Sequence, residues 1–159
     1  MGLSSPSPYN YSLCHGIYQF ETSQNTTYVV NFVFRNGYFP ENEFLEDNVY
    51  LISFHTSSRS RKFDQRIELT LVNIITEFFS RNPESGLIFL CDISNNLQRP
   101  RKITFNKWFK KHNTWFEKHD FKIPGGDHEY LASLIVHQEN PYKRIMLKEC
   151  NKFVSEVSK

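Results

Sequence analysis

Charged side chains suited to binding an anion gather between residues 64 and 102. Two of them stand at the start of a predicted helix, and the others follow a short apolar run, GLIFLC. The five candidates for a ligand site are Asp64, Arg66, Asp92, Arg99 and Arg101. Arginine binds carboxylate and phosphate groups through its planar guanidinium, and a helix start favours negative charge. The pattern therefore predicts an anion-facing crevice.

The same residues also have a purely structural explanation. Asp64 suits the N-cap of the helix, where its carboxylate accepts hydrogen bonds from the first amides. Arg66 would then pair with Asp64 or with Asp92 in an ion pair. Because capping accounts for Asp64 completely, the structural explanation is favoured there. Asp92 could serve as a base, but the nearby sequence offers no nucleophile or second carboxylate, so no catalytic residue is assigned.

A basic stretch with interleaved aromatic residues follows. Between residues 99 and 118 there are seven lysines and arginines and one acid. The candidates for contact with a nucleic acid are Lys102, Lys107, Lys110 and Lys111. Cations for phosphates and rings for bases are what a single-stranded nucleic acid requires. In the alternative, which is the commoner case, the rings are buried and the lysines form a solvated face.

Other site chemistry is poorly represented. The six histidines show no HxxxH or HxH spacing, and the three cysteines form no zinc pattern, so no metal site is predicted. No cofactor is predicted from these residues. The odd cysteine count, the lack of a signal peptide and the lack of a membrane-length apolar run predict a cytoplasmic protein without a membrane partner. The formal net charge is only +2, so attraction to a polyanion would depend on clustering.

Residues 1–14 are rich in Ser and Pro and are predicted to be a flexible tail, and residues 15–159 a single domain. The residues between 39 and 48 form an acidic linker. Period-2 alternation or short apolar runs predict two strands within 17–35 and others at 49–54, 86–91, 115–123 and 130–136. The strand at 86–91 is wholly apolar, which is typical of a strand covered on both faces.

Helical periodicity predicts three helices. The first runs from Asp64 to Asn82 and carries an apolar stripe from Ile67 to Phe79 that should pack on a sheet. A basic helix starts near residue 100, and a last helix starts at Pro141. The element order predicts an α+β fold: one twisted, mostly antiparallel sheet of about six strands, with three helices and a local parallel pair.

This order resembles the later two thirds of the N-acetyltransferase superfamily, over roughly residues 17–136. The resemblance implies a helix start that holds the pyrophosphate of an acyl-coenzyme A. Gln65 matches the start of that motif, whereas Glu68 and Thr70 stand where the superfamily has small residues. Trp108 and Phe109 occupy the region of the superfamily's general-acid tyrosine. These departures favour a protein that is not an enzyme.

Local motifs carry a second resemblance over nearly the whole globular part. They are YQFET with YVVNF, then DQRIELTLVNIITEFF, LCDIS, RKITFNKWF and SLIVHQENP. With these motifs the chain resembles an uncharacterised bacterial family, a domain of unknown function frequent in Bacteroidetes. That family implies no activity.

Three functions stay open. The preferred one is a small binding module with a basic, anion-facing crevice, whose partner is a nucleic acid, a nucleotide or an acidic protein. The second is a divergent N-acetyltransferase-like enzyme that uses an acyl-coenzyme A. The third is a scaffold or antitoxin-like subunit that acts through a partner protein.

Overall fold

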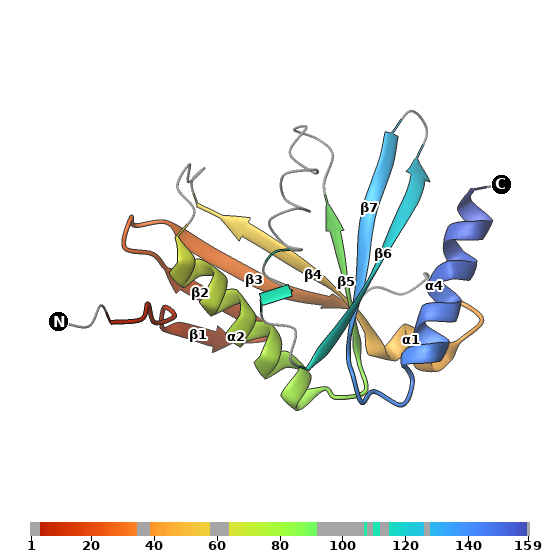
Figure 1. Ribbon diagram of the computed structural model, residues 1–159, viewed down its shortest axis with the longest axis horizontal. Coiled ribbons are helices and arrows are strands. Elements are labelled where there is room, and N and C mark those ends of the chain that lie inside the picture. Colours follow the sequence, from red (N-terminus) through yellow and green to blue (C-terminus); the bar gives the residue numbers. More distant parts are fainter. Residues whose placement is uncertain are drawn as a thin grey trace. The chain divides into compact units, whose positions relative to one another are not determined.

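The computed structural model describes residues 4–34, 39–57, 64–91, 107, 110–111, 115–125 and 128–158. Its strands form one mixed, mostly antiparallel sheet in the order β1-β2-β3-β4-β5-β7-β6 (Figure 1). The strands are β1 (Tyr11–Cys14), β2 (Ile17–Glu21), β3 (Thr27–Phe34), β4 (Val49–Thr56), β5 (Gly86–Cys91), β6 (Phe116–Gly125) and β7 (His128–His137). The helices are α1 (Glu43–Asn48), α2 (Gln65–Arg81) and α4 (Lys143–Val157). The predicted α+β class is confirmed, with seven strands rather than about six.

The chain divides into two compact units. Unit 1 comprises Met1–Phe32 and Ser53–Arg81, and unit 2 comprises Val33–Ile52 and Asn82–Lys159. Strands β3 and β4 contribute residues to both units. The single domain over residues 15–159 stays a prediction.

Unit 1 is built on the hairpin of β1 and β2. His15 and Gly16 form its two-residue turn, and both have positive φ, 51° and 78°. Two residues of positive φ are what a type I′ turn requires, and this turn matches the twist of the flanking strands. The hairpin of β2 and β3 follows, with the register Phe20↔Tyr28, and these two rings stack with centroids 5.1 Å apart.

Helix α2 packs on this part of the sheet through its predicted apolar stripe. The buried residues of the stripe are Ile67, Leu71, Ile74, Ile75, Phe78 and Phe79. The Phe78 ring stacks on Phe32 of β3 with centroids 4.3 Å apart. Figure 1 shows α2 crossing the strands of this unit. The predicted helix and its packing are therefore confirmed.

The prediction of a flexible tail over residues 1–14 was wrong for its C-terminal residues. Tyr11–Cys14 is strand β1, which pairs with β2 from Tyr11↔Phe20 to Cys14↔Ile17. Tyr9 is buried and stacks on Phe20. Strand β1 is also the strand that the predicted count of six lacked.

Unit 2 contains the parallel pair of the sheet. β4 and β5 run parallel from Val49↔Gly86 to Ile52↔Phe89, which confirms the predicted parallel pair. β5 is also antiparallel to β7, and β7 is antiparallel to β6. Strand β5 is less covered than predicted, because Leu87 is buried but Leu90 is 37% exposed. Strand β6 extends beyond the predicted end at residue 123, since Pro124 and Gly125 still pair with β7.

Helix α4 packs against β6 and β7 (Figure 1). The core of this unit is formed by Phe39, Leu45, Val49, Leu134, Val136, Met146 and Cys150. Gly86 allows α4 a close approach, because a β-carbon there would lie 3.0 Å from Met146 Sδ. Two apolar residues of this helix, Ile145 and Val157, are exposed.

The acidic linker at residues 39–48 was predicted without structure, and this was wrong. Glu43–Asn48 forms helix α1, whose start is capped by Asn42. The amide of Leu45 donates to Asn42 Oδ1 at 3.1 Å, and the amide of Phe39 donates to Glu46. An Asn at the N-cap and acids in the first turn stabilise a helix start. The predicted basic helix near residue 100 lies outside the described residues, except for Lys107, Lys110 and Lys111.

Candidate functional site

The start of α2 holds the first predicted site residue, Asp64. The amide of Arg66 donates to Asp64 Oδ1 at 2.8 Å. The amide of Ile67 donates to the Asp64 carbonyl at 2.9 Å. Both contacts are those of an N-cap residue, so the predicted capping role of Asp64 is confirmed.

The second carboxylate oxygen of Asp64 binds the segment that precedes β1. The Tyr9 hydroxyl donates to Asp64 Oδ2, and the amide of Ser23 donates to the same hydroxyl at 3.3 Å. The Tyr9 amide donates to Thr70 Oγ1 at 2.8 Å. Tyr9 therefore bonds to the first turns of α2 through both its backbone and its side chain.

Arg66 holds the same segment from the other side. Its guanidinium carbon lies 3.9 Å from the centroid of the Tyr9 ring, a cation–π geometry. Its Nε donates to the Ser7 carbonyl at 2.8 Å. Asp64 and Arg66 thus lie close together, and both are engaged by residues 7–9 of the chain itself.

The remaining predicted ligand residues cannot be placed with this pair. Asp92, Arg99, Arg101 and Lys102 all lie outside the described residues. Of the five residues of the predicted crevice, the structure therefore describes only Asp64 and Arg66. The convergence of the five residues stays a prediction.

Three of the four nucleic-acid candidates are described. Lys107, Lys110 and Lys111 have helical backbones and exposed side chains. Lys107 and Lys111 are four positions apart, which places them on one side of a helix. Of the aromatic residues after them, Phe116 is buried, whereas Trp115 is 60% exposed. The expectation of buried rings is therefore wrong for Trp115.

The last cation of the basic stretch, Lys118, does not join a basic face. It lies on β6 with a side chain that is only 6% exposed, and its ammonium group pairs with Asp120. The Ser133 hydroxyl of β7 donates to the same carboxylate at 2.6 Å. Asp120 thus neutralises Lys118 within the sheet. The sequence separation of two residues was a signal for this pair, because i and i+2 share one face of a strand.

A second charged cluster joins β6 to the start of α4. Lys143 Nζ lies 2.8 Å from Glu117 Oε1, and His119 Nε2 lies 3.3 Å from Glu117 Oε2. The hydrogen bond from Lys143 lowers the pKa of Glu117, and the contact with His119 adds to this effect. Lys143 also donates to the Gln138 carbonyl at 2.8 Å. Each residue of this cluster has a partner within it, so the cluster fastens α4 to the sheet.

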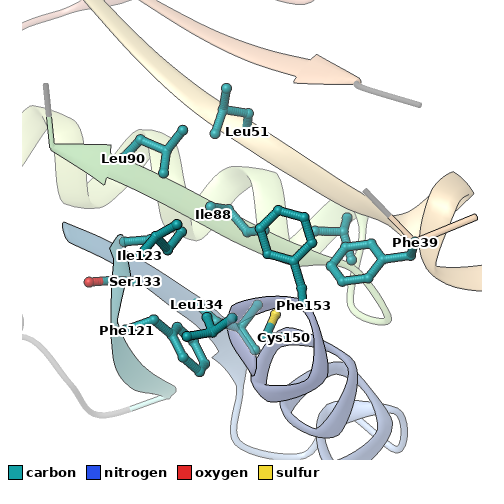
Figure 2. Close-up of a pocket in the computed structure, with 13 residues that line it drawn as sticks. Phe39, Leu51, Ile88, Leu90, Phe121, Ile123, Ser133, Leu134, Cys150 and Phe153 are labelled. Atoms are coloured by element: carbon teal, nitrogen blue, oxygen red, sulfur yellow. The ribbon is translucent and has the colours of Figure 1, made fainter. Parts of the chain in front are cut away.

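Unit 2 also contains an apolar cavity that the sequence analysis missed (Figure 2). Its volume is about 60 Å³. Its walls come from β4, β5, β6, β7 and α4, together with Phe39. The lining residues are Phe39, Val49, Leu51, Ile88, Leu90, Phe121, Ile123, Ala132, Ser133, Leu134, Cys150, Phe153 and Val154.

The described residues meet neither the requirements of a metal site nor those of a membrane-spanning helix. Within that part of the chain, no three His, Cys, Asp or Glu side chains gather to hold a metal ion. Each helix of the same part is too short or too polar to span a bilayer.

One protein family matches the chain over residues 56–152, which is more than half of its length. It is described as a family of unknown function, DUF6169. The chain belongs to this family. The DUF6169 match begins at the end of β4 and includes α2, the lysines, and the cavity-lining residues from β5 to Cys150 of α4. It confirms the resemblance to an uncharacterised family, while the bacterial and Bacteroidetes origin stays a prediction. No curated protein matches the chain.

Proposed function

We propose that the protein is a non-catalytic binding module whose basic surface takes a single-stranded nucleic acid. The observation that carries the proposal is the 60% exposure of Trp115. The backbone at this residue is held, since the amide of Gln138 donates to the Trp115 carbonyl at 2.8 Å. An exposed indole on a fixed backbone is suited to stacking on a base.

Exposed cations lie close to this ring along the chain. Lys107, Lys110 and Lys111 precede it, and Lys111 is only four positions away. Because consecutive Cα atoms are about 3.8 Å apart, the Cα atoms of Lys111 and Trp115 are separated by at most about 15 Å. A single-stranded nucleic acid with one base stacked on Trp115 can therefore place its phosphates near these lysines. This combination of ring and cations supports the proposal.

The crevice at the start of α2 contributes less to the proposed site. Arg66 Nε and the face of its guanidinium are already used by Ser7 and Tyr9. Asp64 is used by the cap and by the Tyr9 hydroxyl. A nucleotide or an acidic protein bound there would compete with these internal contacts. The lysine surface therefore carries the proposal, with Arg99, Arg101 and Lys102 as further candidates.

The test is fluorescence anisotropy of labelled single-stranded oligonucleotides at several salt concentrations. Changing Lys107, Lys110 and Lys111 to Ala should flatten the slope of log affinity against log salt by about two, at about 0.7 per phosphate. Trp115→Ala should weaken binding by about 1–3 kcal/mol and leave that slope unchanged. Lys148→Ala, on the exposed side of α4, is the matched control and should alter neither quantity. An absence of salt-dependent binding at low ionic strength would make the proposal wrong.

A divergent acyl-coenzyme A enzyme is the second candidate. It is favoured by the parallel pairing of β4 and β5 around α2, which agrees with the element order of the resemblance. It is disfavoured by Thr70, because this residue is buried and accepts the Tyr9 amide where the superfamily needs a bare backbone. Acetyl-coenzyme A at 100 times its dissociation constant should raise the apparent stability by about 2.7 kcal/mol if it binds. A thermal shift of that kind would reverse the ranking, and inert results in both assays would favour a scaffold or antitoxin-like subunit.

A further inference from the structure

The apolar cavity of unit 2 lies between one face of the sheet and helix α4 (Figure 2). Strands β4, β5, β6 and β7 form its floor, and Cys150, Phe153 and Val154 of α4 form one wall. The cavity belongs to neither the α2 start nor the lysine surface. Its chemistry therefore has to be considered separately from the proposed nucleic-acid site.

The cavity wall has almost no polar chemistry to offer a ligand. Among the described residues that line it, only Ser133 and Cys150 carry a polar atom in the side chain. The Ser133 hydroxyl is engaged by Asp120 at 2.6 Å, and Figure 2 shows its oxygen pointing away from the neighbouring labelled side chains. Burial raises the pKa of Cys150 to about 12, so this thiol is neutral at ordinary pH. A polar group entering the cavity would lose its hydration without replacement, whereas hydrocarbon would not.

The depth of the cavity depends on one small side chain. Ala132 lines it and is the sole alanine of the whole chain. Its direct neighbours in the sheet register are Leu90 on β5 and Phe121 on β6, which are both large. The side chain between them ends at the β-carbon, and the space above it stays open. A larger residue at position 132 would project into the same space.

The size and opening of the cavity define the shape of a ligand. One water-sized group occupies about 10–15 Å³ of such a volume, so about 60 Å³ holds about four to six groups. A methylene group is close to water in size. Leu90 on the rim is 37% exposed, so a ligand can keep one end in solvent. A short hydrocarbon chain with a hydrated head suits this volume and this exposed end.

We propose that this cavity binds the short aliphatic chain of a small amphipathic molecule, such as a medium-chain fatty acid. The chain lies over Ala132 against Phe153 and Cys150, and the head group stays in solvent beside Leu90. The cavity recognises the hydrocarbon rather than the head, because the described residues of its wall offer no free ionic or hydrogen-bonding group.

Isothermal titration calorimetry with two homologous series tests the proposal. The probes are n-alkyl carboxylates and n-alkyl alcohols of four to ten carbons, added to the full chain below their micelle concentrations. Affinity should rise about fourfold per methylene, as expected from about 0.8 kcal/mol for each buried group, and should level off after about four to six carbons. Both head groups should give the same dependence on chain length. Affinity that ignores chain length, or an absence of binding, would overturn the proposal.

Filling the cavity provides the matched variant. Ala132→Leu should reduce the affinity for octanoate at least tenfold, and Ala132→Val, which suits a strand and adds less bulk, should reduce it less. Asn151→Leu adds comparable apolar bulk on an exposed position of α4 that does not line the cavity, and should leave the affinity unchanged. If Ala132→Leu fails to fold, Ala132→Val decides alone. Unchanged octanoate affinity in a folded Ala132 variant would show that the chain binds elsewhere and would overturn the proposal.

Discussion

The Tyr9 hydroxyl donates a hydrogen bond to the Asp64 carboxylate across 55 positions of the chain. The other oxygen of this carboxylate accepts the amide of Arg66 and caps α2. One side chain therefore fixes both the start of the helix and the segment that leads into β1. The anion that the helix start attracts is supplied by the protein itself.

The double role of Asp64 gives the first prediction. Asp64→Ala removes the cap, worth about 1–2 kcal/mol, and a hydrogen bond worth about 1 kcal/mol. Tyr9→Phe removes the hydrogen bond alone. Urea unfolding should therefore show a loss of about 2–3 kcal/mol for Asp64→Ala and about 1 kcal/mol for Tyr9→Phe. Asp64→Asn keeps a capping side chain and should fall between them, and equal losses for all three would contradict the double role.

Two glycines should respond to alanine for different reasons. At Gly86 a β-carbon would lie 3.0 Å from Met146 Sδ and 3.2 Å from Leu134 Cδ1, so overpacking should cost about 1–3 kcal/mol. At Gly16 nothing lies within 4 Å, but φ is +78°, so the left-handed backbone should cost about 1–2 kcal/mol. Gly16→Asn should be tolerated better than Gly16→Ala, because Asn visits this region readily.

A double-mutant cycle separates the two causes. Met146→Leu removes the sulfur that the new β-carbon would meet, so it should lower the cost of Gly86→Ala by more than about 0.5 kcal/mol. The same change should add to Gly16→Ala without coupling. Additive free energies of unfolding at Gly86 would show that packing against Met146 is not the cause.

The cysteines should differ in their reaction with iodoacetamide. Cys14 is exposed, whereas Cys150 is buried with its pKa raised to about 12. At pH 8 the thiolate fraction of Cys150 is about one ten-thousandth, and the thiolate is the reactive form. Peptide mass mapping should find Cys14 modified before Cys150, which should stay protected until urea unfolds the chain. Equal modification of the two residues in the folded protein would contradict the burial of Cys150.

The cluster of Glu117 and Lys143 should contribute stability that depends on pH. Because the hydrogen bond from Lys143 lowers the pKa of Glu117, the unfolded chain binds this proton more readily than the folded one. The contribution is therefore present above the ordinary pKa of a glutamate and is lost as the pH falls through the lowered value. Glu117→Gln should flatten the dependence of Tm on pH below about 4.5.

Glu41 provides the control for this pH experiment. It pairs with Lys152 on the surface, where its side chain is 78% exposed. Solvent screens such a pair, so Glu41→Gln should change the pH profile of Tm less than Glu117→Gln. A larger effect for Glu41→Gln would show that surface charge, rather than the link between β6 and α4, governs acid stability.

Features encoded by neighbouring residues could be predicted from the sequence. Helix α2 is an example, because its cap at Asp64 and its apolar stripe both lie within a few turns. Strand β1 could not be predicted, because four residues carry little periodicity. Its anchor also depends on the bond between Tyr9 and Thr70, which are 61 positions apart. Helix α1 was missed because its acidic composition resembles a linker, although Asn42 was a signal for a cap.

In the candidate site, too, the features set by neighbouring residues could be predicted and those set by distant contacts could not. Asp64 and Arg66 are two positions apart in the sequence, so their proximity follows from the helix start itself. The engagement of Arg66 by Ser7 depends on a contact across 59 positions and has no local signal. The cavity was missed because it is formed by side chains from four strands and a helix. The single alanine at position 132 was the sequence feature that could have indicated the cavity.

The two strands that pair with β5 are synthesised at very different times. β4 precedes it, but its other neighbour, β7, pairs through contacts such as Gly86↔Val136. About fifty residues lie between these two positions, and a ribosome adds about 5–20 residues each second. For about 3–10 seconds, the edge of β5 that later pairs with β7 therefore stays unpaired, and other chains can bind to it. During that interval the nascent protein is most exposed to aggregation, so the yield of folded protein should depend on how quickly residues 92–137 are translated.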